Sequence, residues 1–200
     1  SHFNTAIGND ALFTHNQATS IESFNTAVGF NTAANLTTGI RNTMIGAKAG
    51  DALTDADFNT SIGFESVTAD TLGSYTTAVG YQALASQNFT TATNSHNTAV
   101  GMQSLAGVTT GVENTALGSA SGISVTTGIR NTLIGAQAGD ALTDADFNVA
   151  LGQQAITSDT LGSYTTAIGY GALNEQNFTT ATNTYNTAVG ALAGAAISTG

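Results

Sequence analysis

The chain has 200 residues and a formal net charge of -10, from 3 Lys+Arg and 13 Asp+Glu, and it contains no cysteine. So few cations exclude nucleic-acid binding, which needs clustered positive charge, and leave no basic surface for anionic lipid. The absence of cysteine excludes disulfides, thiolate chemistry and cysteine-ligated zinc. No apolar run approaches the ~18–20 residues of a membrane span, so we expect no membrane insertion of this segment.

A short phrase of the type Asn-Thr-Ala-Val-Gly recurs along the whole chain. In chain order, its eleven closing glycines are Gly8, Gly29, Gly46, Gly63, Gly80, Gly101, Gly118, Gly135, Gly152, Gly169 and Gly190. Seven of the intervals between them are 17 residues long and three are 21 residues long. Four intervals of 17 and one of 21 make a longer period of 89 residues, by which 39–59 return as 128–148 and 72–84 return as 161–173. Residues 1–200 are therefore one repeat array.

The repeat unit predicts strands rather than helices. Helix-pair repeats need more than about 30 residues, and this unit of 17 is rich in Val, Ile, Thr, Phe and Tyr between glycines. We therefore expect an all-β fold, a parallel β-solenoid or β-roll of eleven coils of about 17 residues, each with two short strands. Successive coils would pair at ~4.8 Å.

The residues before each glycine, counted back from the glycine as position zero, form two alternating faces. Position −1 is Val, Ile or Leu, position −3 is Thr except at Val149, and position −5 is mostly aromatic. Position −4 is mostly Asn and position −2 is usually Ala, and with the glycine these make a bare face that another backbone can approach. We predict that the Thr and Val/Ile rows point inward. The bare face would pack around the axis of an elongated homotrimer of parallel chains, with an Asn ladder along it.

One acidic stretch, repeated once, is a candidate calcium site. Its residues are Asp51, Asp55 and Asp57 in the first copy and Asp140, Asp144 and Asp146 in the second. Clustered oxygen ligands suit Ca²⁺, but the stretch lacks the glycine and distal glutamate of a helical calcium loop. The alternative is a solvated acidic turn.

The four extra residues of the longer intervals fall within 9–24, 81–96 and 170–185. A coil stacked on shorter neighbours cannot absorb them without losing register, so we expect projecting loops. In two copies an aromatic residue stands among neutral hydrogen-bonding residues, a combination that suits sugar contact. The candidate receptor contacts are Phe89, Thr90, Thr91, Phe178, Thr179 and Thr180. The alternative is a spacer loop whose phenylalanine packs back on the solenoid.

The phrase at 24–32, which reads Phe-Asn-Thr-Ala-Val-Gly-Phe-Asn-Thr, resembles the head repeat of trimeric autotransporter adhesins. It also resembles repeats of phage tail fibres and bacterial surface fibres. The adhesin resemblance implies a left-handed parallel β-roll assembled as a trimer. The longer coil and the shifted position of the Asn depart from that family's pattern.

No grouping of Ser, His and Asp suggests a catalytic triad, and we expect no enzyme and no cofactor. We expect a structural or adhesive segment of an extracellular, cell-surface or virion fibre. Its partners would be other copies of the chain and a host-surface glycan or protein. The alternatives are an ice-binding solenoid, or a self-assembling surface filament without a ligand. The repeat pattern continues to both ends, so we expect the segment to belong to a longer array or to pair its ends with other subunits in a filament.

Overall fold

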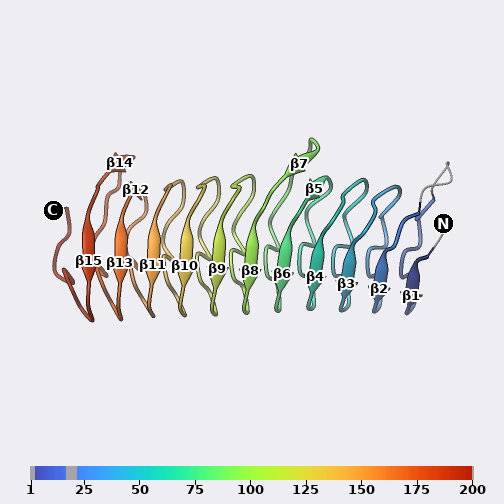
Figure 1. The fold of residues 1–200 in the computed structure, drawn as a ribbon, viewed down its shortest axis with the longest axis horizontal. Helices are drawn as coiled ribbons and strands as arrows, with labels where there is room; N and C mark the ends of the chain where they lie inside the picture. Colours follow the sequence, from blue (N-terminus) through green and yellow to red (C-terminus); the bar gives the residue numbers. More distant parts are fainter. Residues whose placement is uncertain (1–2, 17–21, 200) are drawn as a thin grey trace.

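A computed structural model describes residues 3–16 and 22–199, and these form a single elongated stack of coils with the chain ends at opposite extremes (Figure 1). The described residues contain strands and turns but no α-helix, so the predicted all-β solenoid is confirmed. Each coil contributes one three-residue strand to a common sheet. These strands are β1 (Thr5–Ile7), β2 (Thr26–Val28), β3 (Thr43–Ile45), β4 (Thr60–Ile62), β6 (Thr77–Val79), β8 (Thr98–Val100), β9 (Thr115–Leu117), β10 (Thr132–Ile134), β11 (Val149–Leu151), β13 (Thr166–Ile168) and β15 (Thr187–Val189).

All neighbouring strands of this eleven-stranded sheet are parallel and in register, so each position of the phrase forms a row along the solenoid. Thr98 pairs with Thr115, for example, and Val100 pairs with Leu117. The expectation of two strands in every coil was wrong. Second strands occur only around the two described 21-residue coils, as β5 (Gly73–Ser74) with β7 (Thr93–Asn94) and as β12 (Gly162–Ser163) with β14 (Thr182–Asn183). Elsewhere in the described chain the rest of the coil is turns and irregular backbone.

The corners of each coil are left-handed backbone turns. Positions −5, +2 and +4 have φ near +50 to +62°, and most of these residues are not glycine; they include Phe58, Gln103 and Ala120. This conformation disfavours residues with a Cβ by roughly 1–2 kcal/mol each, so packing between coils must hold it. The glycine at position zero serves a different need, because a Cβ on Gly101 would lie 2.4 Å from the carbonyl oxygen of Gly118 in the next coil.

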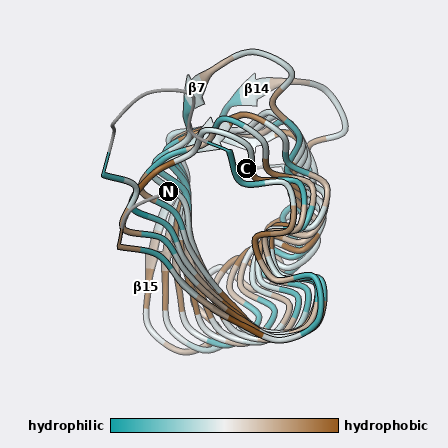
Figure 2. Ribbon diagram, turned by 90° about the vertical axis from the view of Figure 1, so that its right-hand side faces the viewer, coloured by the Kyte–Doolittle hydropathy of each residue, from teal (hydrophilic) through white to brown (hydrophobic). Residues whose placement is uncertain are grey.

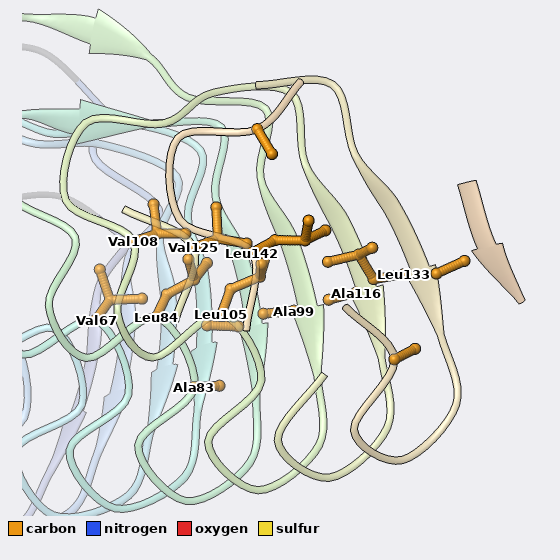
Figure 3. Close-up of a cluster of buried hydrophobic side chains, with 14 of the residues drawn as sticks. Val67, Ala83, Leu84, Ala99, Leu105, Val108, Ala116, Val125, Leu133 and Leu142 are labelled. Atoms are coloured by element: carbon orange, nitrogen blue, oxygen red, sulfur yellow. The ribbon is translucent and has the colours of Figure 1, made fainter. Parts of the chain in front are cut away.

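The interior is narrow and is filled by one continuous cluster of buried apolar side chains (Figure 3). Where position +4 is Leu, as at Leu105, position −2 of the same coil is Ala99. Where position −2 is the larger Leu133, position +4 is Gly139, and a Cβ there would lie 2.8 Å from a methyl carbon of Leu133. In these two coils a large residue on one wall is therefore opposed by a small residue on the other, and where both are small, as at Ala116 and Gly122, leucines of the neighbouring coils fill the space: a Cβ on Gly122 would lie 2.6 Å from a methyl carbon of Leu133.

A ladder of buried asparagines runs beside this apolar core. The side-chain oxygen of Asn114 accepts the backbone N–H of Asn131, and its amide nitrogen donates to the carbonyl of Gly128, each across one coil. The same contacts recur at Asn25, Asn42 and Asn148. The predicted Asn ladder is confirmed, but it lies inside the solenoid and satisfies backbone groups that no strand pairs.

The face assignment made from the sequence was reversed. Ala27, Ala99 and Ala116 of the bare face are buried in the core. The Thr and Val/Ile rows, predicted to be inward, lie on the outer side of the sheet, with Leu117 48% exposed. The interior of a 17-residue coil is too thin for two layers of branched and aromatic side chains, so the small residues point inward. The bare face is covered by the coil's own opposite wall and needs no other chain.

Candidate functional surfaces

The outer side of the eleven-stranded sheet is the most distinctive surface of the molecule. We call it the sheet face and define it by four rows, at positions −5, −3, −1 and +1 from each phrase glycine. Among the described residues, 17 of the 20 exposed large apolar side chains belong to these rows. They are Phe3, Ile7, Phe24, Phe30, Ile45, Phe58, Phe64, Tyr75, Tyr81, Met102, Leu117, Val149, Leu151, Tyr164, Tyr170, Tyr185 and Val189. Monomeric soluble proteins rarely expose so many large apolar groups on one side.

The aromatic residues of the sheet face stack on one another along the solenoid. Phe58 and Tyr75 have ring centroids 4.9 Å apart and nearly parallel planes, and Phe147 and Tyr164 repeat this at 4.8 Å. The guanidinium carbon of Arg41 lies 5.3 Å from the centre of the Phe58 ring. The ring faces are therefore largely occupied by neighbours, and the row presents ring edges outward. Such a row is a poor platform for stacking sugar rings.

Charge is nearly absent from the sheet face. Its charged side chains are Arg41, Arg130 and Glu113, all in the row at position −5, so twelve of the thirteen acidic residues of the chain lie elsewhere. Arg130 donates from Nε to Oε2 of Glu113 at 2.7 Å, and this hydrogen bond lowers the pKa of the Glu113 carboxyl and raises that of the Arg130 guanidinium. Because both groups are exposed, the pair contributes little to stability.

A buried polar network links each described 21-residue coil to the coil before it, at positions where other coils have apolar residues. Asp70 is fully buried at a position that is leucine or valine in several other coils. Its carboxylate accepts hydrogen bonds from Gln87 Nε2 and from the backbone N–H groups of Gly73 and Phe89. Gln87 also donates to Thr76, which replaces the ladder asparagine in this coil. The buried donors of Gln87, Gly73 and Phe89 thus have acceptors inside the solenoid.

The second copy repeats this network in the same arrangement. Asp159 accepts from Gln176 Nε2 and from the N–H groups of Gly162 and Phe178. The network was missed in the sequence, although one signal was present: threonine replaces asparagine at position −4 at Thr76 and Thr165, the two coils that precede the long intervals. Asp70 and Asp159 therefore anchor the loops from inside the solenoid.

Both long coils project loops at the same corner of the solenoid, seen along the axis in Figure 2 at β7 and β14. Thr90, Thr91, Thr179 and Thr180 are exposed on these loops, as expected for receptor contacts. Phe89, however, is only 5% exposed, so its assignment as a receptor contact was wrong: its ring packs back on the solenoid. Phe178 is partly buried. The first long interval includes residues 17–21, which lie outside the described residues.

The candidate calcium ligands act as hydrogen-bond acceptors between coils. Asp51 accepts from Thr68, Asp55 from Thr38, and Asp57 from the backbone N–H of Ile40. Asp140, Asp144 and Asp146 make the equivalent contacts with Thr157, Thr127 and Ile129. Within residues 3–16 and 22–199, no group of three or more His, Asp or Glu side chains is placed to hold a metal ion. The structure therefore does not assemble the six carboxylates into a metal centre.

One serine–histidine contact also escaped the sequence analysis. His15 Nε2 lies 3.1 Å from the hydroxyl of Ser23, and burial lowers the pKa of His15. Ser23 is fully buried, so its hydroxyl is not presented to a substrate. The pair fits a structural contact between neighbouring coils.

Comparison with protein-family models, curated proteins and solved structures finds no match to this chain. In the part of the chain that the structure describes, no helix has the length and apolar character to cross a membrane.

Proposed function

We propose that the chain is a structural and adhesive segment of an extracellular, cell-surface or virion fibre. The observation that carries the proposal is the uninterrupted register of eleven parallel strands, which makes a stiff rod of roughly 50 Å at the usual strand spacing. Loops that project at one corner suit the presentation of contacts to a host glycan or protein, since solenoid insertions often form the binding face.

The adhesive part of this proposal rests on the exposed tips of the two described loops. Thr90, Thr91 and Ala92 recur as Thr179, Thr180 and Ala181, and all six are exposed. Residues outside the loops have diverged between the two 89-residue periods, for example from Phe64 to Gln153 on the sheet face and from Lys48 to Gln137 at position +2. The fold does not require identical exposed tips, so their identity supports contact with a repeated partner.

The test is adhesion of rods with trimmed loops. Beads coated with the intact chain, and beads coated with a variant lacking residues 90–93 and 179–182, are applied to cells and to immobilised surface polysaccharides. We expect retention of the intact chain and loss of retention for the trimmed one, with unchanged circular dichroism. Equal retention of the two proteins would remove the loops as the adhesive element. Negative-stain images of short straight rods test the structural part separately.

Ice binding is the second candidate, because the structure places the Thr row outward. Thr98, Thr115 and Thr132 stand in register on successive strands of a sheet face poor in charge. A regular rank of hydroxyl and methyl groups can order water. Thermal hysteresis of the intact chain, and its loss in a Thr98→Tyr and Thr115→Tyr double variant, would support this role. Absence of thermal hysteresis would exclude ice binding and leave the fibre role as the remaining candidate.

A further inference from the structure

We infer that the sheet face is the surface through which copies of this chain associate with their solenoid axes parallel. The inference deepens the proposed fibre role, on which it rests, and it replaces the Asn/Ala/Gly face that the sequence suggested for the trimer axis. That face is interior, whereas the sheet face is exposed and apolar.

The composition of the sheet face is that of an interface core. Interface cores are depleted in charge and enriched in aromatic residues, Met and Arg. On a chain of net charge -10, this side carries two arginines, one glutamate and most of the exposed aromatic rings. Apart from Glu113 and the buried Asp70 and Asp159, the acidic residues lie on the other sides of the solenoid, where they keep an assembled rod soluble.

The size of the sheet face is sufficient for a stable complex. Eleven strands at ~4.8 Å extend over roughly 50 Å, and the seven positions from −5 to +1 span at most about 20 Å, since only positions −3 to −1 are strand. The resulting upper limit of about 1,000 Å² is comparable with the ~800 Å² that each partner contributes to a standard interface.

The periodicity of the sheet face points to another copy of the same chain as its occupant. Rows of Val, Ile and Leu with one residue per strand form ridges that repeat at the strand spacing; Val79, Val100 and Leu117 are three successive members. Only a solenoid with the same strand spacing can pack its ridges between these rows over the whole length of the sheet face. A second copy meets that condition at every coil.

The experiment measures the mass of the intact chain by sedimentation equilibrium at concentrations up to about 100 µM. We expect a mass of two or three copies. A face variant, Val100→Arg with Leu117→Arg, places two adjacent charges in the middle of the sheet face. It should weaken association by about 100-fold or more, since each unpaired charge would be buried without a partner.

The matched control adds the same two charges away from the sheet face, as Ser86→Arg with Thr110→Arg. Both positions are exposed. We expect the control to keep the mass of the intact chain, and circular dichroism should show all three proteins folded. A single-copy mass for the intact chain would overturn the inference. It would also be overturned if the face variant assembled normally, as end-to-end pairing predicts, or if both variants dissociated alike. The adhesion and imaging tests of the fibre role do not depend on these masses.

Discussion

Gln87 donates its side-chain amide to the buried carboxylate of Asp70 at 2.6 Å, across one coil, and so ties the projecting loop to the solenoid. The donors around Asp70 all require an acceptor, which its two carboxylate oxygens provide. Asp70→Asn keeps the shape but turns a hydrogen-bond donor toward the Gln87 amide. We expect a loss of about 1–3 kcal/mol in the free energy of unfolding, measured by urea denaturation.

The control for this prediction is Asp55→Asn. Asp55 is exposed and accepts a hydrogen bond from Thr38, so its replacement should change stability by no more than about 0.5 kcal/mol. Asp159→Asn, in the second copy, should match Asp70→Asn. If Asp55→Asn and Asp70→Asn lowered the free energy of unfolding by the same amount, this would contradict the role given to the buried network.

The core layers predict which enlargements the solenoid tolerates. Ala99 is buried opposite Leu105, and Thr98 beside it is on the sheet face. Ala99→Leu should cost about 1–3 kcal/mol by overpacking, whereas Thr98→Leu should be nearly neutral. Adding Leu105→Ala to Ala99→Leu should restore part of the loss, because that layer then resembles the natural pair of Leu133 and Gly139. Thermal melting of the four proteins checks the order, and a similar loss for Thr98→Leu and Ala99→Leu would mean that the faces are again misassigned.

The spacing of the glycines and the composition of the unit were together sufficient to predict the fold, because a repeat of 17 residues rich in strand formers is too short for a helix pair and stacks as in-register strands. It could not tell which face is interior. Hydrophobicity places Val28 and Phe24 inside and Asn25 outside, and the structure has the opposite arrangement. Two features outweigh hydrophobicity here. A coil this short leaves little room inside, and backbone groups at its irregular corners need the buried asparagines as partners.

The loops show the same limit of sequence reasoning. The extra residues predicted a projection correctly, but the interpretation of Phe89 as a contact neglected what anchors a loop. Its backbone N–H is held by Asp70, which lies 19 residues earlier in the chain, so the ring is drawn against the solenoid. A contact between coils of this kind becomes visible only when the register of the stack is known.

The left-handed corners predict an unusual response to glycine. Ala120 has φ of +55°, where glycine is more favourable than alanine. Ala120→Gly should therefore cause no loss of stability and a gain of up to about 1 kcal/mol. The comparison is Ala136→Gly, at position +1, where the backbone is not left-handed and the usual loss of about 0.5–1 kcal/mol is expected. The test compares the urea midpoints of the two variants with that of the unaltered chain. A lower midpoint for Ala120→Gly would show that this corner is not strained.

The last prediction concerns acid sensitivity near the beginning of the chain. Burial is the main cause that lowers the pKa of His15 below its ordinary value of 6.5. The folded chain therefore holds this imidazole neutral, while the unfolded chain takes up its proton as the pH falls through about 6.5. The stability that depends on a neutral His15 is fully present above that pH, and the free energy of unfolding decreases as the pH falls below it. Urea midpoints at pH 7.5 and pH 5.5 should fall more for the unaltered chain than for His15→Gln, which has no group titrating at this position. The same decrease in both proteins would show that protonation of His15 does not oppose folding.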